Sequence, residues 1–172
     1  MNPTDRVFLD FSTKKLRQLA SRIEACLGKL DDDQIWLRGS DNANAVGNLC
    51  LHLAGNVRQW IMHGVGGAPD NRARDQEFAA RGGIPKSELW SNLSSTLDEA
   101  IAVIDAQQDL LRVVKPQTYQ VNVLEAIYHV VEHFAQHTAQ IIYATKAFSG
   151  EDLGFYGFLS KPKPAETKDP TP

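Results

Sequence analysis

The chain has 172 residues, of which 42% are hydrophobic and 23% charged, and its formal net charge is −3. A chain of this length and composition is typical of one globular domain that buries its own core. The small acidic excess argues against nucleic acid as the main ligand. No apolar run approaches the ~18 residues that a membrane span needs. We therefore expect one domain over residues 1–160, with neither a nucleic-acid nor a membrane partner.

Apolar residues recur every three or four positions in four segments, which is the period of an amphipathic α-helix. The segments are 4–29, 45–63, 87–111 and 123–148. Thr4 is expected to cap the first helix, and Asn42 or Asn44 the second. Asn122 and Glu125 have the spacing of a capping box at the start of the fourth. Four helices of roughly 20 to 26 residues predict an all-α fold, an antiparallel four-helix bundle.

Three further segments fall outside this helical pattern. No period holds across residues 64–85, which form a Gly-, Arg- and Asp-rich connection. Connections of this length in a compact domain are usually functional or mobile. No strand alternation extends beyond a few residues. After residue 150, four apolar side chains are expected to dock on the bundle: Phe155, Tyr156, Phe158 and Leu159. Residues 161–172 hold four of the eight prolines and are expected to be disordered.

The two cysteines, Cys26 and Cys50, lack the paired spacing of a redox or zinc motif. In a chain of this size they do not form a disulfide framework, and we expect both thiols to be small buried hydrophobes. The first ten residues carry charges and lack the apolar stretch of a signal peptide. These features favour a protein of the reducing cytoplasm.

Three of the five histidines recur every fourth residue in the fourth helical segment, at His129, His133 and His137. This spacing puts them on one helix face, and apolar neighbours turn that face towards the core. A charged imidazole is costly to bury, and a metal ion compensates because it binds the neutral ring. His129 and His137 lie about 12 Å apart along the axis, too far to share one ion easily. The spacing therefore allows either His129/His133 or His133/His137 as the ligand pair.

A further ligand must come from another helix, and the second predicted helix contains His52 and His63. They lie about 16 Å apart along that helix, so only one of them can join a given site. We favour His52, which is well inside the helix, whereas His63 precedes a glycine at its end. Asn56, one turn after His52, is then placed to orient a ligand or a bound water. His63 is interpreted as a surface residue, and His129 as a neighbour of the ligands.

Three neutral histidines with open positions are typical of a catalytic rather than a structural metal site. The donor set suits Zn, Ni, Co, Fe or Cu, and we keep Zn, Ni, Fe and Mn as the ions to test. A fourth protein ligand, such as His129 or Glu132, would close the site and favour a structural role.

The segments NLCLHLAGNVRQW and HVVEHFAQHTAQIIYATK resemble motifs of the DinB family (DNA-damage-inducible, YfiT-like metal-binding bundles). The family pattern, one histidine in the second helix and an HxxxH pair in the fourth, falls on His52, His133 and His137. HFAQHTAQI is the most specific piece, although many relatives have glycine where this chain has Ala139. The resemblance spans about residues 5–150 and selects His133/His137 as the pair. It implies an up-down-down-up bundle, often a homodimer, that holds a divalent metal ion.

The resemblance also implies several functions, among them S-transferases and isomerases that use bacillithiol, mycothiol or glutathione. We therefore expect a metal-dependent enzyme, a thiol S-transferase or a hydrolase, that acts on a small molecule. Arg72, Arg74 and Arg81 are candidate contacts for an anionic thiol or carboxylate. Asn56 and Arg74 are the residues most expected to bind it. Two alternatives stay open: a non-catalytic metal- or ligand-binding stress protein, and a metal-free interaction module with buried histidines.

Overall fold

The structure is a computed structural model that describes residues 2–160, and this part of the chain is mainly helical. Its five α-helices are α1 (Pro3–Leu27), α2 (Val46–Val57), α3 (Arg74–Ala79), α4 (Lys86–Asp105) and α5 (Val123–Ser149). A π-helical stretch, η2 (Arg58–Val65), continues α2, and two 3-10 turns are η1 (Gln34–Trp36) and η3 (Gly157–Ser160). The strands β1 (Val113–Val114) and β2 (Val121–Asn122) form one antiparallel pair.

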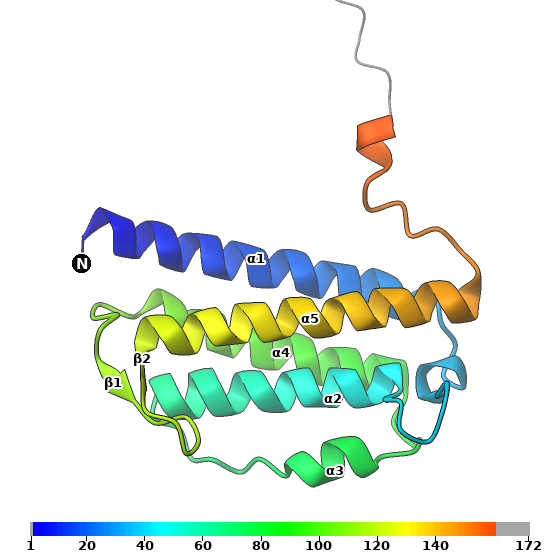
Figure 1. Cartoon of the computed structure of the whole chain (residues 1–172), viewed down its shortest axis with the longest axis horizontal. Coiled ribbons are helices and arrows are strands. Elements are labelled where there is room, and N and C mark those ends of the chain that lie inside the picture. Colours follow the sequence, from blue (N-terminus) through cyan, green and yellow to red (C-terminus); the bar gives the residue numbers. More distant parts are fainter. Residues whose placement is uncertain (1, 161–172) are drawn as a thin grey trace, which may run out of the picture.

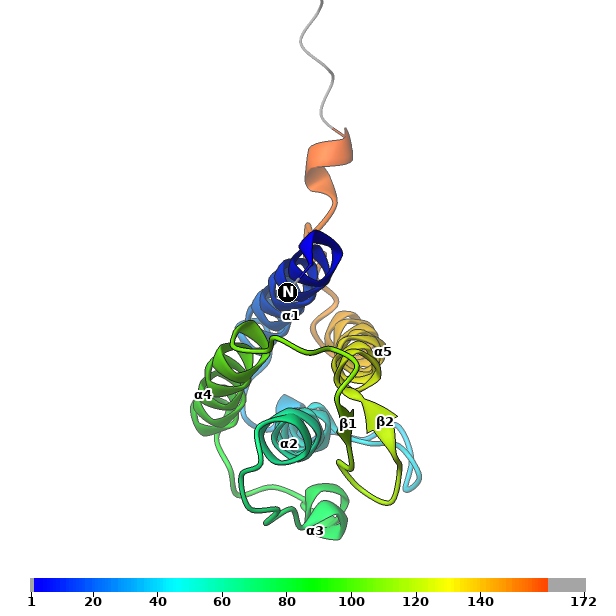
Figure 2. The same cartoon turned by 90° about the vertical axis from the view of Figure 1, so that its left-hand side faces the viewer.

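The four long helices lie side by side along the long axis of the molecule (Figure 1). α1 packs against α4 and α5, and α2 packs against the same two helices. Seen end on, α1 and α2 therefore occupy opposite corners (Figure 2). The chain runs in one direction along α1 and α5 and in the other along α2 and α4 (Figure 1). Apolar side chains of all four helices fill the centre, among them Leu16, Leu53, Leu93 and Phe134.

The capping residues explain where two of these helices begin. The box predicted at the start of α5 is confirmed, because the Glu125 N–H donates to Asn122 Oδ1 and the Asn122 N–H donates to Glu125 Oε2. The cap predicted for the first helix is wrong. Asn2, not Thr4, accepts from the Asp5 N–H, at 2.9 Å, and Pro3 takes the first helical position, where no N–H is needed.

The second helix begins without the predicted asparagine cap. Ala45 holds the capping position, and its N–H donates to Asn48 Oδ1 at 3.1 Å from inside the helix. The prediction of Asn42 or Asn44 is therefore wrong. At the other end, the helix continues through η2 with wider turns, as the Gly66 N–H bonds to the Ile61 carbonyl five residues back. π-Helical turns are rare in proteins, and those that occur often lie at functional sites.

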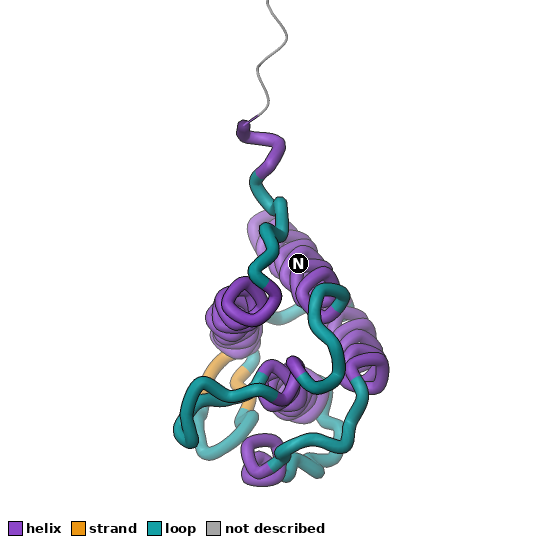
Figure 3. The backbone as a smooth tube through the Cα atoms, turned by 90° about the vertical axis from the view of Figure 1, so that its right-hand side faces the viewer, coloured by secondary structure: helices purple, strands orange, loops and turns teal. Residues whose placement is uncertain are grey.

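Short elements account for the other differences from the sequence prediction. The third long helix ends at Asp105, not at residue 111, and the chain then forms the β1–β2 pair, which was not predicted. α3 lies in the segment for which no period was found. Figure 3 shows it outside the four long helices, next to α2. Two-residue strands and a six-residue helix are too short to produce a readable period.

The segment after α5 only partly contacts the rest of the protein. Phe155 is half-buried against the core. Tyr156 is 59% exposed, but its hydroxyl accepts from Arg22 Nη1 of α1 at 3.4 Å. Leu159 is 70% exposed, so the prediction that it docks is wrong. Figure 1 shows this segment leaving the helices. The Phe158 side chain and residues 161–172, with their predicted disorder, lie outside the described residues.

Two further predictions concern the cysteines and the membrane. Cys26 and Cys50 are both buried free thiols, as predicted. Burial raises the pKa of each thiol, that of Cys50 to about 12, so neither is a reactive nucleophile at neutral pH. Among the helices of residues 2–160, none has the length and apolar character to cross a membrane.

Candidate metal centre

Three histidines from two helices meet where α2 packs against α5. His52 Nε2 lies 3.0 Å from His133 Nε2, which in turn lies 3.2 Å from His137 Nε2. One ligand atom from each ring lies within 4.8 Å of the other two. The i, i+4 spacing puts His133 and His137 on one face of α5, and the antiparallel course of α2 places His52 opposite them. The three residues predicted as ligands are thus brought together.

The outer ring nitrogens of two of these histidines face oxygen acceptors. His52 Nδ1 lies 2.9 Å from Glu77 Oε2, and His137 Nδ1 lies 2.8 Å from Gln140 Oε1. Both oxygens can only accept, so the hydrogen of each neutral ring is assigned to Nδ1. Each Nε2 atom then directs a lone pair into the cluster. Metal-binding histidines typically show this arrangement of an outer acceptor and an inner lone pair.

His133 lies between the other two rings and cannot satisfy both. Its Nδ1 is buried without a hydrogen-bond partner in the described part of the chain. A hydrogen on His133 Nε2 can point at His52 or at His137, but a single hydrogen does not pair well with both lone pairs at once. A cation, by contrast, attracts all three Nε2 atoms. The donor set and its hydrogen bonds therefore fit a divalent metal ion bound by neutral imidazoles.

The surroundings keep the α5 histidines neutral. Burial, followed by repulsion from the His137 and His52 rings, lowers the pKa of His133 to about 3. Burial also lowers the pKa of His137, although its hydrogen bond with Gln140 acts in the opposite direction. The neutral ring is the form that binds a metal, so these shifts favour metal binding at neutral pH.

Glu77 of α3 is the residue of this site that sequence reasoning missed. Its side chain contacts His52 and is held by two hydrogen bonds from Arg72, at 2.7 and 2.8 Å. Burial alone would raise the pKa of Glu77, but the bonds from Arg72 and His52 outweigh it and lower the pKa. The one signal in the sequence was Gly55 inside a predicted helix, because glycine is unfavourable there relative to alanine and usually has a packing or functional reason.

The other two histidines lie outside the cluster. The His129 ring stacks on Trp60, with the ring centroids 3.8 Å apart. The Nδ1 atom of His63 is 2.7 Å from the Ala68 carbonyl oxygen, at the end of η2. Glu132 is exposed on α5. Within residues 2–160, no fourth histidine, cysteine or carboxylate joins the group of three.

A cavity of about 470 Å³ borders the cluster. Its lining includes two histidines of the cluster, His52 and His133, together with His129. Both residues predicted to bind a ligand, Asn56 and Arg74, also line it. Asn56 is buried, and its Oδ1 has no partner in the described part of the chain. Arg74 is exposed, with its guanidinium 4.9 Å from the centre of the Phe78 ring. These two residues are thus placed beside the cavity, and what they bind stays a prediction.

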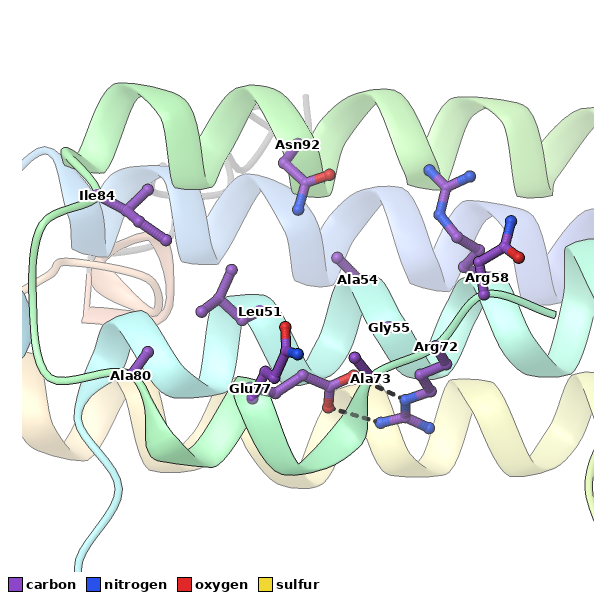
Figure 4. A pocket seen from close by; sticks show the side chains of 12 residues that line it. Leu51, Ala54, Gly55, Arg58, Arg72, Ala73, Glu77, Ala80, Ile84 and Asn92 are labelled. Atoms are coloured by element: carbon purple, nitrogen blue, oxygen red, sulfur yellow. Dashed lines mark hydrogen bonds and ion pairs between the residues drawn. The ribbon is translucent and has the colours of Figure 1, made fainter.

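The three arginines of the 64–85 segment have different positions. Arg72 lines the cavity beside the cluster and also a second cavity of about 380 Å³, which its ion-pair partner Glu77 lines as well. Figure 4 shows the second cavity, with two dashed lines joining Arg72 to Glu77. Arg81 instead donates to backbone carbonyls at the end of α3, such as that of Phe78 at 2.7 Å. Of the predicted anion contacts, only Arg72 and Arg74 line the cavity beside the histidines.

Comparisons with known proteins identify the family and the fold. No curated protein sequence matches the chain. One similar solved structure is the "crystal structure of the conserved protein of locus from Enterococcus faecalis", with a TM-score of 0.68 and 17% sequence identity. The match covers 88% of this chain and 99% of that one, and at this identity it shows the fold alone. A family described as "protein of unknown function (DUF1572)" matches residues 4–163, so the chain belongs to that family.

Proposed function

We propose that the protein binds one divalent metal ion through His52, His133 and His137. The observation that carries this proposal is the convergence of three Nε2 atoms, two of them on rings whose Nδ1 atoms face oxygen acceptors. Hydrogen bonds alone leave this group imperfectly paired, whereas a cation matches all three atoms. The resemblance of these residues to the DinB family supports the same ligands. It also supports an antiparallel up-down-down-up four-helix bundle and a homodimer.

We further propose that the centre is catalytic, with a thiol S-transferase or a hydrolase as the two candidate activities. The cavity beside His52 and His133 supports this, because a structural site would be closed by a fourth ligand. When bound, a divalent ion lowers the pKa of a thiol or of water and so supplies a nucleophile at neutral pH. Zn, Ni, Fe and Mn are the ions to test.

The side chains around the cavity have separate roles in this proposal. Arg74 attracts an anionic group of the thiol or substrate from the exposed side of the cavity. The buried Asn56 Oδ1 accepts a hydrogen bond from a ligand N–H or O–H. Trp60 and Tyr119, whose ring centroids are 6.2 Å apart, provide an apolar surface for the remainder of the small molecule.

Metal content is the first test. Elemental analysis of tag-free wild type should find one divalent ion per chain, and His133→Ala should lose it. His63→Ala is the matched control, because His63 lies outside the cluster, and it should keep the ion. Wild type that stays metal-free after reconstitution with Zn, Ni and Mn would contradict the proposed site.

Activity separates the catalytic proposal from its alternative. The metal-loaded protein should accelerate either the addition of a low-molecular-weight thiol to an electrophile or the hydrolysis of an activated ester. His133→Ala should reduce that rate to background. A loaded wild type whose rates equal those of His133→Ala in both reactions would favour a non-catalytic metal-binding protein.

A further inference from the structure

α3 is a short helix that hydrogen bonds hold against α2. Six residues are too few to form a stable helix alone, so its position depends on the rest of the protein. The buried Asn48 Nδ2 donates to the carbonyls of Glu77 and Ala80, at 2.8 and 3.0 Å. Arg38 Nη2 donates to the carbonyls of Phe78 and Ala80, at 3.3 and 3.1 Å. These bonds place the backbone of α3 directly over the turn of α2 that carries His52.

The Glu77 carboxylate receives hydrogen bonds on both of its oxygens. Arg72 Nε donates to Oε1 at 2.7 Å, and Arg72 Nη2 donates to Oε2 at 2.8 Å (Figure 4). His52 Nδ1 donates to the same Oε2 at 2.9 Å. Arg72 Nη2 is also 3.1 Å from His52 Nδ1 and could donate to it only in the other tautomer, which would leave the Nδ1 lone pair facing the negative Oε2 atom. With the hydrogen on Nδ1, both groups donate to the carboxylate. Glu77 is only 9% exposed, so water competes little for these bonds.

Gly55 makes room for this carboxylate. A Cβ atom at position 55 would lie 2.0 Å from Glu77 Oε1 and 2.9 Å from its Cδ. Both contacts are too close for real atoms, so the Glu77 side chain would have to leave its place. Glycine inside a helix is unfavourable relative to alanine. Glycine at position 55 therefore makes α2 less stable than alanine would, but its lack of a side chain lets Glu77 reach His52.

We propose that Glu77 is the positioning residue of the metal centre and that Arg72 holds its carboxylate in place. Glu77 keeps the ring hydrogen of His52 on Nδ1, so the Nε2 lone pair faces His133 and His137. The proposal rests on the proposed metal site and adds a part of it that lies on neither α2 nor α5. It makes metal affinity depend on the 64–85 segment, although none of the three ligands lies there.

Glu77→Gln is a sharp test because a glutamine amide has one oxygen and one NH2 group. If the oxygen accepts from His52, the NH2 group faces Arg72 Nε, which is also a donor. If the amide is reversed, the NH2 group faces His52 Nδ1 and favours the other tautomer. Neither orientation reproduces the wild-type bonds. Gly55→Ala is an independent second variant that displaces Glu77 without changing its chemistry.

Two measurements follow. Ring 15N NMR of the metal-free protein reports which nitrogen of His52 carries the hydrogen, and competitive titration with Co²⁺ reports metal affinity. Wild type should show hydrogen on Nδ1. Both variants should bind Co²⁺ about 10- to 100-fold more weakly, and Gly55→Ala, which displaces the acceptor, should also shift His52 towards hydrogen on Nε2. Asp75→Asn, an exposed carboxylate on α3, and Gly39→Ala, whose Cβ would meet nothing within 4 Å, should match wild type.

The outcomes separate this proposal from the proposed function. An unchanged His52 tautomer and unchanged Co²⁺ affinity in both variants, or in the one that folds as judged by circular dichroism, would overturn the role of Glu77. A wild type that binds no Co²⁺ would instead overturn the metal site. In that case, the tautomer measured in the metal-free protein still shows whether Glu77 keeps the ring hydrogen of His52 on Nδ1.

Discussion

The interface between α5 and the α2–η2 helix uses histidine in two different ways. At one end, His133 meets His52 with their Nε2 atoms 3.0 Å apart. One turn earlier on α5, His129 stacks on Trp60 instead, with the ring centroids 3.8 Å apart. His129 and His133 lie four residues apart on the same face of α5. The side chain that the opposite helix presents decides which histidine becomes a candidate ligand and which a packing residue.

The two ends also differ in their polar surroundings. At the cluster, Glu77 and Gln140 accept from the outer nitrogens of His52 and His137. At the other end, Trp60 is 5% exposed and provides a large apolar face. We infer that the cluster end contributes metal affinity and the Trp60 end contributes stability. Four substitutions or conditions test this division.

The largest expected effect comes from removing a ligand at the cluster end. His137→Ala should abolish measurable Zn²⁺ or Co²⁺ binding, because it leaves only two of the three imidazoles. His129→Ala, one turn beyond His133 on the same face, should bind the ion as wild type does. Isothermal titration of the two variants decides between the two histidine pairs that the spacing allows. Loss of binding in His129→Ala with binding kept in His137→Ala would reverse the assignment.

Trp60→Ala should have the largest effect on stability at the other end. It empties a buried aromatic site and removes the ring on which His129 stacks, so the free energy of unfolding should fall by about 3 kcal/mol. Metal affinity should stay at the wild-type value. Urea unfolding measures the first effect and metal titration the second. Tyr119→Ala is the control, since Tyr119 is 58% exposed, and it should cost less than about 0.5 kcal/mol.

Asn122→Ala should have a smaller effect at the same end, where α5 begins. The substitution removes the acceptor for the Glu125 N–H and should lower the free energy of unfolding by about 1 kcal/mol. The cluster lies three to four turns further along α5 and should bind metal normally. Thr4→Ala is the control, because Thr4 does not cap α1. Equal losses in both variants by urea unfolding would argue against the cap as the cause.

The last expected effect concerns how steeply the free energy of unfolding of the metal-free protein depends on pH. The folded state holds the pKa of His133 at about 3, below the ordinary 6.5. As pH falls below 6.5, the unfolded chain takes up a proton that the folded chain does not. This contribution to stability is therefore complete above pH 6.5 and is lost as pH falls towards 3. The lowered pKa of Glu77 acts in the same direction below its ordinary value of 4.5.

His133→Asn isolates this contribution because it removes the titrating ring from the cluster. Its free energy of unfolding, measured with a chelator present, should fall less steeply between pH 6.5 and pH 4.5 than that of wild type. His129→Asn should also reduce the slope, since burial lowers the pKa of His129 too. Parallel curves for wild type and His133→Asn would show that His133 titrates normally in the folded protein.

Much of the fold was predictable because the signals for long helices are local. An apolar stripe with a period near 3.6 identified four long helical segments, and Asn122 with Glu125 marked the start of α5. Short elements were not predictable in this way. α3 and the β1–β2 pair depend on contacts with distant residues, such as the bond from Asn48 to the Glu77 carbonyl 29 residues away.

For the candidate site, the sequence by itself determined the kind of donor and the spacing along one helix. A spacing of four residues in a helix places His129, His133 and His137 on one face, whatever the remainder of the chain does. Only the tertiary structure decided which of them meets His52, 81 residues from His133, and that Glu77 reaches His52 past Gly55. The physical reason is that spacing along a helix follows from local backbone geometry. The side chain opposite each turn depends instead on how two helices are aligned, and the packing of the whole core sets that alignment.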